Sequence, residues 1–523
     1  MKFEDLNDTQ ISKMSEIYWN RDLTWDERMK NLSEYIGKSE RTIQKWISKL
    51  GITEKALTES PQYIKAKERK FDKKKKRFLI TWAQNDTPVH ENFILNLEAY
   101  ANHINADIHV IAGRYKNPTS VFTDKNYDTW SERIIQYLDA GRHEVHKHMW
   151  IMSDVKIQPT AVDPMTGLQG MSGINSCVFG SPKVHMETIP VLEGNLPKLM
   201  VTTGACTVKN YTDSKSGKKG EFHHTLGFVI VEIKNGDIFF SRQVTATDDG
   251  NFTDLFYRVE SGEVKKNSSV AAAILGDLHY GQHDERVIKK TIDLFKDLKP
   301  ENVVLHDVFD GLSINHHESK DPFIQYQREI DGTNSLRKEI DMMLNGLEDF
   351  KNYNVTIVRS NHDDFLDRWL KNTDWRKANT LKNSIEYMEF SALLLKGSAP
   401  HGIIPFLINQ KFPNFRTLGR SDSFVVNGWE LGQHGDIGSN GTRGSLIQFR
   451  KLNTKIVVGH YHSPGRKDGA LAVGTSTKLR VNYNLGPSGW LQSHVIIHHD
   501  SKAQHINFIK GEFTTLKLDQ NEL

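Results

Sequence analysis

The stretch AAAILGDLH, residues 271–279, decides how the second half of the chain is expected to fold. Its first five residues form an apolar run typical of a buried strand, and Asp277 and His279 follow that run directly. The same pattern, an apolar run and then side chains of metal-binding types, returns four more times. The further instances are VVLHDVFDG at 303–311, VTIVRSNHD at 355–363, FVV at 424–426 before GQHGD at 432–436, and IVVGHYH at 456–462.

Polar side chains that follow strands of one α/β sheet meet in a single crevice, because the carboxyl ends of parallel strands lie at one edge. We therefore expect the five clusters to form one site. Carboxylates, imidazoles and one amide would make a mixed nitrogen and oxygen site suited to divalent ions such as Mn²⁺, Fe²⁺ or Zn²⁺. No thiolate belongs to the clusters, which argues against a structural zinc site of the cysteine type.

In this order the five clusters resemble the motifs of the calcineurin-like metallophosphoesterases, which are DxH, GDxxD, GNHD, H and GHxH. The resemblance covers about residues 268–500 and implies an αββα sandwich with two metal ions at one edge. It implies His362 as a histidine that binds no metal and lies over the scissile phosphate, oriented through a hydrogen bond with Asp310. The implied metal ligands are Asp277, His279 and His462 for one ion, Asn361, His434 and His460 for the other, and Asp307 as the bridge.

Two positions depart from the family pattern. His306 replaces the usual glycine before the bridging aspartate, and Ser360 replaces the glycine before Asn361. Neither position supplies a ligand, so we expect some crowding but no loss of metal binding. The segment 312–350 also lengthens the gap between the second and third clusters. It contains a helical stretch at 335–350 that would form a substrate wall or an oligomer contact.

Residues 1–58 are expected to form an all-α unit of the helix-turn-helix type. Thr24 and Glu27 have the spacing of a capping box, Gly37 suits the end of that helix, and Ser39 suits the start of the next. The stretch 32–47 resembles the helix-turn-helix domains of phage and transposase-type proteins. The second helix would present a basic outer face to DNA, made by Arg41, Gln44, Lys45 and Lys49. The alternative is a helical hairpin used for protein contacts or oligomerisation.

A basic linker is expected at 59–77, where lysine and arginine are crowded. It would be either a solvated linker or a strip that contacts phosphates without sequence preference. The lysines placed in that strip are Lys73, Lys74, Lys75 and Lys76.

The region 78–262 reads as a central α/β domain without a motif that yields a mechanism. Apolar runs at 78–82 and 108–111 flank a helical pattern at 88–103, which indicates a parallel βαβ unit. The same order of elements occurs at 271–305, with Gln84, Asn85 and Asp86 where the later copy has its first metal-binding cluster. The region is either a degenerate relative of the catalytic domain at 266–523 or an ordinary βαβ arrangement.

The bulk properties agree with a multi-domain α/β protein. The chain has 523 residues, too many for one core, and its net charge of +3 is nearly neutral. No run approaches the roughly 20 apolar residues of a membrane span, and the polar N-terminus has no signal region, so we expect a cytoplasmic protein without a membrane partner. The two cysteines, Cys177 and Cys206, have no metal-ligand spacing, and no disulfide is expected.

The choice of substrate rests on finer features of the motifs. Asp310-Gly311 lacks the arginine of the protein phosphatases, and Asn361-His362-Asp363 lacks their glutamate, so the pattern looks more like the SbcD-like nucleases. With the N-terminal helices, it is also similar to the early host-DNA-degrading nucleases of some large tailed phages. We therefore expect a DNase with two divalent ions, Mn²⁺ ahead of Fe²⁺, Zn²⁺ or Mg²⁺, that forms a homo-oligomer in the host cytoplasm. The alternatives are a small-molecule phosphodiesterase or nucleotidase, and a DNA-binding regulator with an inert enzyme remnant.

Overall fold

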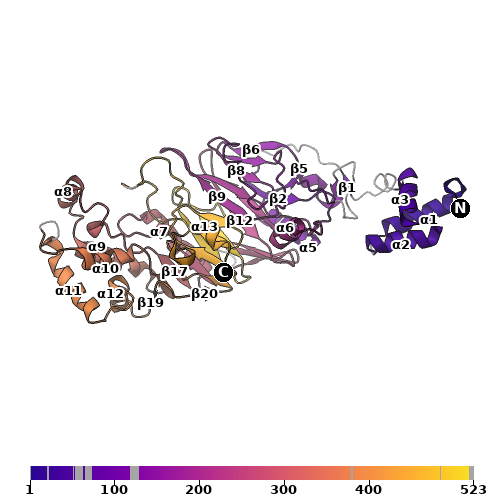
Figure 1. Ribbon diagram of the computed structural model, residues 1–523. Helices are drawn as coiled ribbons and strands as arrows, with labels where there is room; N and C mark the ends of the chain where they lie inside the picture. Colours follow the sequence, from indigo (N-terminus) through magenta and orange to yellow (C-terminus); the bar gives the residue numbers. More distant parts are fainter. Residues whose placement is uncertain are drawn as a thin grey trace.

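The computed structural model describes residues 2–20, 23–50, 52, 63–64, 74–117, 129–377, 381–482 and 484–516. Three helices at the N-terminus precede a mixed α/β body built on several sheets, in which the predicted α/β class is confirmed (Figure 1). Among the described residues, no helix is both long enough and apolar enough to cross a membrane.

The N-terminal unit has one helix more than the sequence predicts. Helix α1 (Asp8–Trp19) precedes α2 (Trp25–Ile36) and α3 (Glu40–Lys49), and its Met14 packs with Leu32 and Ile43 in a small core. The predicted capping box is present, because Thr24 N–H donates to Glu27 at 2.8 Å and Glu27 N–H donates to Thr24 Oγ1 at 3.4 Å. Gly37 ends α2 with a φ of 68°, a left-handed conformation that favours glycine.

The second half of the chain contains a six-stranded sheet and part of a ten-stranded sheet. The first has the order β19-β18-β17-β16-β25-β26, and its strands are β16 (Ala272–Ile274), β17 (Val303–His306), β18 (Val355–Val358), β19 (Arg416–Leu418), β25 (Ser493–Ile497) and β26 (Ala503–Asn507). The ten-stranded sheet takes from this half β20 (Val425–Val426), β21 (Trp429–Glu430), β22 (Lys455–Val458), β23 (Gly465–Lys467) and β24 (Ala470–Ala472).

These two sheets change one expectation about the site. The first three metal-binding clusters follow β16, β17 and β18 of the six-stranded sheet, whereas the last two follow β21 and β22 of the other. The clusters therefore do not end strands of a single sheet. They meet because the two sheets pack face to face over a core that includes Val304, Val457 and Leu471.

The first half has the same two kinds of sheet. Strand β2 (Arg77–Ala83), helix α5 (Glu91–His103) and strand β3 (Asp107–Ala112) confirm the predicted parallel βαβ unit. They belong to a five-stranded sheet of order β12-β11-β2-β3-β5, with β5 (Leu138–Asp139), β11 (Gly227–Ile233) and β12 (Phe239–Thr245). The remaining strands of the ten-stranded sheet are β6 (Arg142–His146), β7 (Met149–Met152), β8 (Ser176–Phe179), β9 (His185–Ile189) and β10 (Lys198–Thr202).

The two halves repeat one topology. The order β12-β11-β2-β3-β5 matches β26-β25-β16-β17-β18, and β6-β7-β8-β10-β9 matches β20-β21-β22-β24-β23, with the same parallel and antiparallel pairs throughout. This agreement favours the degenerate-relative interpretation of the first half. Strands β9 and β23 pair directly and make one sheet of both halves, so the expected units 78–262 and 266–523 share it.

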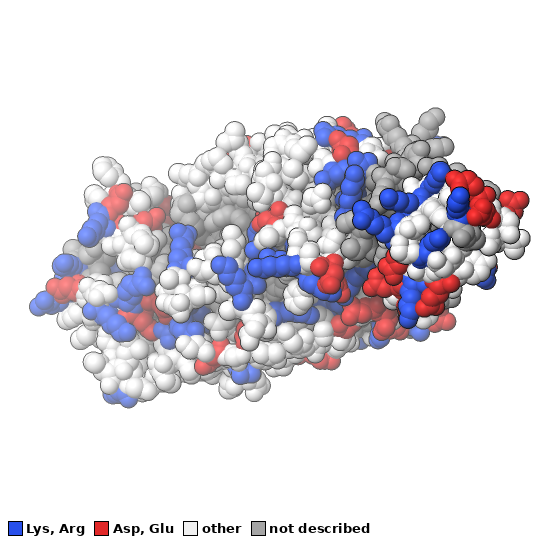
Figure 2. Space-filling view, turned by 45° about the vertical axis from the view of Figure 1, so that its right-hand side comes forward, with Lys and Arg blue, Asp and Glu red and all other residues white. Residues whose placement is uncertain are grey.

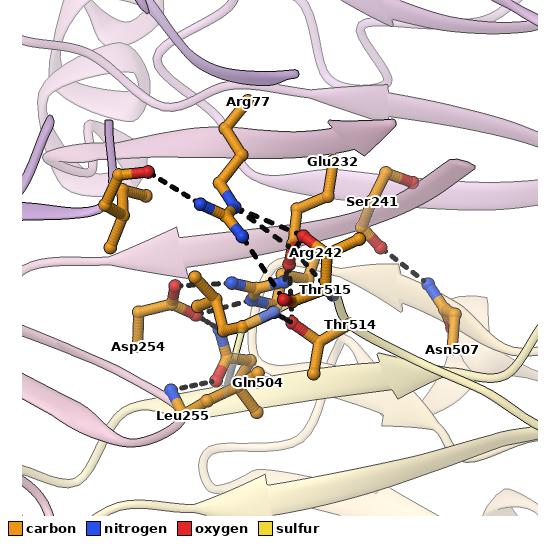
Figure 3. Close-up of polar contacts among 12 residues, drawn as sticks. Arg77, Glu232, Ser241, Arg242, Asp254, Leu255, Gln504, Asn507, Thr514 and Thr515 are labelled. Atoms are coloured by element: carbon orange, nitrogen blue, oxygen red, sulfur yellow. Dashed lines mark hydrogen bonds and ion pairs between the residues drawn. The ribbon is translucent and has the colours of Figure 1, made fainter. Parts of the chain in front are cut away.

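A buried polar network also joins the halves (Figure 3). The guanidinium of Arg242 on β12 is paired with Glu232 and Asp254, and Gln504 on β26 donates to Asp254 at 2.8 Å. Thr515 N–H near the described C-terminal end donates to Glu232 at 2.7 Å. Every charge in this network has an opposite charge or a hydrogen bond, as buried charges require.

Helices cover the sheets and extend the second half. Helix α7 (Glu285–Leu298) follows β16, and the insertions around β18 form a helical lobe at one end of the molecule (Figure 1). The predicted helical stretch at 335–350 is confirmed as α9 (Leu336–Gly346) and a 3-10 turn (Leu347–Phe350). The other lobe helices are α8 (Pro322–Asp331), α10 (Asp363–Asn372), α11 (Ser384–Leu395) and α12 (Ile403–Lys411). The shorter elements are α6 (Lys215–His223), α13 (Leu446–Phe449), β1 (Tyr63–Ile64), β4 (Trp130–Ser131), β13 (Phe252–Asp254), β14 (Tyr257–Glu260) and β15 (Glu263–Lys266).

Candidate metal centre

The ends of β16, β17 and β22 bring together the first group of metal-binding side chains. His462 Nε2 lies 3.2 Å from the carboxylate of Asp277 and 3.1 Å from His279 Nε2, which in turn lies 3.3 Å from the carboxylate of Asp307. All four side chains are buried. The structure thus places together the residues that the family resemblance assigns to one ion and to the bridge.

The second group shares Asp307 with the first. His434 Nε2 lies 3.1 Å from the carboxylate of Asp307 and 3.2 Å from Asn361 Oδ1, and His460 belongs to the same cluster of ligand atoms. Two adjoining groups with one common carboxylate have the arrangement expected for a pair of divalent ions.

Asp310 contacts a second histidine, His279, besides the predicted His362. Its carboxylate lies 3.2 Å from His279 Nδ1, on the ring edge opposite the ligand atom Nε2. The hydrogen bond to His362 instead comes from the main chain, because His362 Nδ1–H donates to the Asp310 carbonyl at 2.6 Å. Asp310 therefore orients both imidazoles, one through its side chain and one through its backbone.

The oxygens of Asp277 and Asp307 fit a cation. Both oxygens of each carboxylate are buried, and they accept no hydrogen bond from the part of the chain that the structure describes. Burying two carboxylates side by side without donors costs several kcal/mol per group unless a positive charge offsets it. The mixed set of imidazole, carboxylate and amide donors suits divalent ions of the Mn²⁺, Fe²⁺ or Zn²⁺ type.

The proton affinities of the centre follow from its charges. Burial lowers the pKa of His434, but the carboxylates of Asp307, Asp277 and Asp436 together raise it to about 9, and the pKa of His279 also lies well above its ordinary value. Burial raises the pKa of Asp307, but the imidazoles around it hold that pKa well below the usual range. His362 differs, because burial lowers its pKa to about 4 and keeps it neutral.

Strained backbone positions the ligands. His279, Asp307, His460 and His462 all have positive φ, between 41° and 58°, a conformation that costs energy for any residue with a side chain. Gly459 leaves room for two other ligands, since a Cβ there would lie 2.6 Å from Asp277 Oδ1 and 2.9 Å from His434 Nδ1.

Several supporting residues escape the sequence motifs. Ser476 N–H donates to the Asp277 carbonyl at 2.8 Å, and Asp277 N–H donates to Gly474 at 3.1 Å, so the loop after β24 holds the first ligand in place. A signal existed, because this glycine turn repeats the one at 203–207 in the first half. Of the two departures from the family pattern, His306 is fully buried beside His434, and Ser360 N–H donates to Asp363 at 2.9 Å.

Comparison with known proteins gives the chain a family. No family model matches it. The A1 protein of Escherichia phage T5 is 30% identical over 472 residues, which are 84% of this chain and 83% of that protein. The chain belongs to the A1 family of that phage protein. A solved structure that aligns with 46% of this chain is 9% identical to it in sequence, with a TM-score of 0.24. This score is too low to support an argument about fold.

The residues predicted to contact DNA in this A1-family protein lie far from the metal centre in sequence. Arg41, Gln44, Lys45 and Lys49 are all exposed on α3, as predicted, and the Lys49 ammonium lies 4.1 Å from the centroid of the Phe3 ring. Figure 2 shows basic and acidic side chains side by side on the end of the molecule where the N-terminal helices lie, so that surface is not uniformly basic.

The predicted lysine strip is only partly described. Lys74 and Lys76 are exposed, whereas Lys75 is half-buried and donates to Asn105 Oδ1 at 2.6 Å. Lys73 lies outside the described residues. Two of these lysines therefore lie on the surface.

Proposed function

We propose that this A1-family protein is a two-metal DNase of the calcineurin-like metallophosphoesterase type. The observation that carries the proposal is the meeting of seven donor side chains from five separate strand ends in one buried centre. Bound divalent ions supply an activated water and neutralise the charge of a phosphodiester. The exposed basic residues of the N-terminal helices support DNA as the substrate, and because the relative is a phage protein, we place the activity in the infected host cell, on host DNA.

The protein's own side chains hold protons where this reaction needs them. His362 keeps its Nδ1 proton on the Asp310 carbonyl, so Nε2 is the atom that accepts a proton and returns it to the leaving oxygen. Its low pKa, caused by burial, keeps it neutral before that exchange. The carboxylate of Asp310 stabilises the ligand tautomer of His279 in which Nε2 is free to bind a metal.

The decisive experiment is a gel assay on linear and circular duplex DNA with Mn²⁺, with Mg²⁺ and with a chelator. We expect Mn²⁺-dependent degradation that is lost in Asp307→Asn, because that variant loses the shared carboxylate, and in His362→Ala. The second variant should keep its bound metal and lose about 10²- to 10⁴-fold in rate. His103→Ala, which changes an exposed histidine outside the centre, is the matched control. Intact DNA together with rapid turnover of nucleotides would show a nucleotidase instead.

The role of α3 has a separate test. Replacing Arg41 and Lys45 by alanine should weaken duplex binding in a catalytically inactive His362→Ala background. If each side chain neutralises one phosphate, the slope of log affinity against log salt should fall by about 2. An unchanged affinity and slope would assign the helices to protein contacts, and the DNase proposal would then rest on the metal centre alone.

A further inference from the structure

Three side chains outside the metal centre gather between the two sheets of the first half. His109 Nε2 lies 3.1 Å from the carboxylate of Asp139, and His143 Nε2 lies 2.9 Å from the same oxygen, Oδ2. His109 and Asp139 are fully buried, and the side chain of His143 is 11% exposed. The three ligand atoms all lie within 4.8 Å of one another.

The position of this group in the fold is specific. His109 lies on β3 and alternates with Ile108 and Val110, which pack toward helix α5, so its side chain faces the other sheet. Asp139 ends β5, and His143 lies on β6. Strands β5 and β6 are the outer strands of the two sheets at this end of the molecule, where the chain passes from one sheet to the other.

We infer that His109, Asp139 and His143 form a binding site for one divalent transition ion of the zinc type, separate from the catalytic pair. Ligands 2.0–2.1 Å from a tetrahedral zinc lie about 3.4 Å from one another, close to the spacings seen here. Two imidazoles and a carboxylate are a common protein set for this ion. Ser153, whose Oγ lies 3.1 Å from His109 Nε2, is placed to complete the shell directly or through water.

The role of this ion would be structural. The strand ends of the first half lack the catalytic donors, because Ser181 and Lys183 occupy the places that His460 and His462 occupy after β22. The group instead lies inside the sandwich, with His109 in the middle of its strand. An ion there would link the outer strands of both sheets and stabilise the folded state, as structural zinc ions do.

The test counts ions in a protein whose catalytic centre is disabled. The full-length variant Asp277→Ala/Asp307→Asn/His434→Ala, which removes a ligand from each ion of the catalytic pair and the shared carboxylate, is loaded with Zn²⁺, freed of excess ion and measured by elemental analysis. We expect one Zn²⁺ per chain, no Zn²⁺ after adding His143→Ala or Asp139→Asn, and one Zn²⁺ after adding His103→Ala. A background without bound Zn²⁺, or an unchanged count in the His143→Ala and Asp139→Asn variants, overturns the inference.

A second measurement does not depend on the background variant. In the otherwise unchanged protein, His143→Ala should bind one ion fewer than the wild type and keep its Mn²⁺-dependent activity. Zn²⁺ should raise the melting temperature of a chelator-treated wild type more than that of His143→Ala, because an ion bound only to the folded state stabilises it. Equal ion counts and equal Zn²⁺ shifts in the two proteins would show a hydrogen-bonded cluster without metal.

Discussion

Met186 of β9 lies directly opposite Arg466 of β23, and the two residues occupy the same place in their respective halves. Met186 also pairs with Val201 on β10, three residues before Gly204. In the same way, Arg466 pairs with Leu471 on β24, three residues before Gly474. A local twofold axis therefore passes between them. The strand ends of the first half that correspond to the metal centre consequently lie toward the opposite edge of the shared sheet from the metal centre.

This relationship predicts unequal effects of substitution at equivalent positions. His460→Ala should abolish Mn²⁺-dependent DNA cleavage, because it removes a metal-binding side chain. Ser181→Ala, at the matching place in the first half, should leave the rate per folded molecule within about twofold of the wild type, as expected away from the reacting atoms. A gel assay at equal concentrations of folded protein checks both, and a large loss in Ser181→Ala would mean that the first half takes part in catalysis.

Asp310→Ala should weaken metal binding although Asp310 is not a ligand. Its carboxylate fixes the ring of His279, and loss of such a partner typically costs 10- to 100-fold in metal affinity. Mn²⁺ titration by calorimetry measures the effect. The Asp310 carbonyl that holds His362 survives the substitution, so activity should recover at saturating Mn²⁺. Activity that stays lost at saturation would assign the carboxylate a direct role in the reaction.

Gly459→Ala should disrupt the metal centre, whereas alanine at a nearby glycine with room for a Cβ should not. The added Cβ would lie 2.6 Å from Asp277 Oδ1, so the ligand or the strand end must move. We expect loss of Mn²⁺ binding with retention of the overall fold, measured by metal content and circular dichroism. Gly469→Ala is the control, because its Cβ would meet Lys455 at an ordinary 3.4 Å. Similar metal contents in both variants would contradict the steric argument.

Acid should destabilise the fold through His494. Gly276 N–H donates to its Nδ1 at 3.0 Å, so this ring must stay neutral, and burial lowers its pKa to about 4. Because the unfolded chain takes up this proton near pH 6.5, stability is full above that pH and falls as the pH approaches 4, by on the order of 3 kcal/mol. Urea unfolding between pH 7.5 and 4.5 should show a smaller loss in His494→Gln. Parallel curves for the two proteins would exclude His494 as the cause.

The helical lobe should mediate self-association. A homo-oligomer is also what the sequence predicts. Ile385 is 69% exposed and Leu395 is 89% exposed on α11, and Phe323 is 84% exposed on α8. Apolar surface of this kind is normally covered in an assembly. Light scattering should show an oligomer for the wild type and a monomer for the double variant Ile385→Glu/Leu395→Glu. The control Val162→Glu, which changes an exposed residue outside the lobe, should remain an oligomer. A wild type that is monomeric at micromolar concentration would contradict this role.

The strands and the ligands could be predicted because they share one local pattern. An apolar run such as 303–305 followed by Asp307 is visible within a few residues, and β17 begins at the predicted Val303. Sheet membership has no such local signal. The sequence around His434 does not reveal that β21 belongs to a different sheet from β17, since pairing depends on contacts with distant segments.

Roles that depend on one atom could not be predicted either. The positions of Asp310 and His362 in the sequence are equally compatible with a hydrogen bond from His362 to the carboxylate of Asp310 or to its carbonyl. Only the folded backbone selects the carbonyl. The group of His109, Asp139 and His143 was missed because its first member lies alone in a strand, 30 residues before the others. Helix α1 was also missed, although Ile11, Met14, Ile17 and Tyr18 recur at helical spacing and Asn7 with Gln10 forms its capping box.

The shared sheet also sets the order of events during synthesis. The ribosome completes β9 long before β23, so the first half of a nascent chain presents an open strand edge without its natural neighbour. His462 emerges late as well, which leaves the metal centre incomplete in any chain that stops short of it. If the protein is the proposed DNase, truncated products should therefore aggregate through that edge and lack activity on DNA.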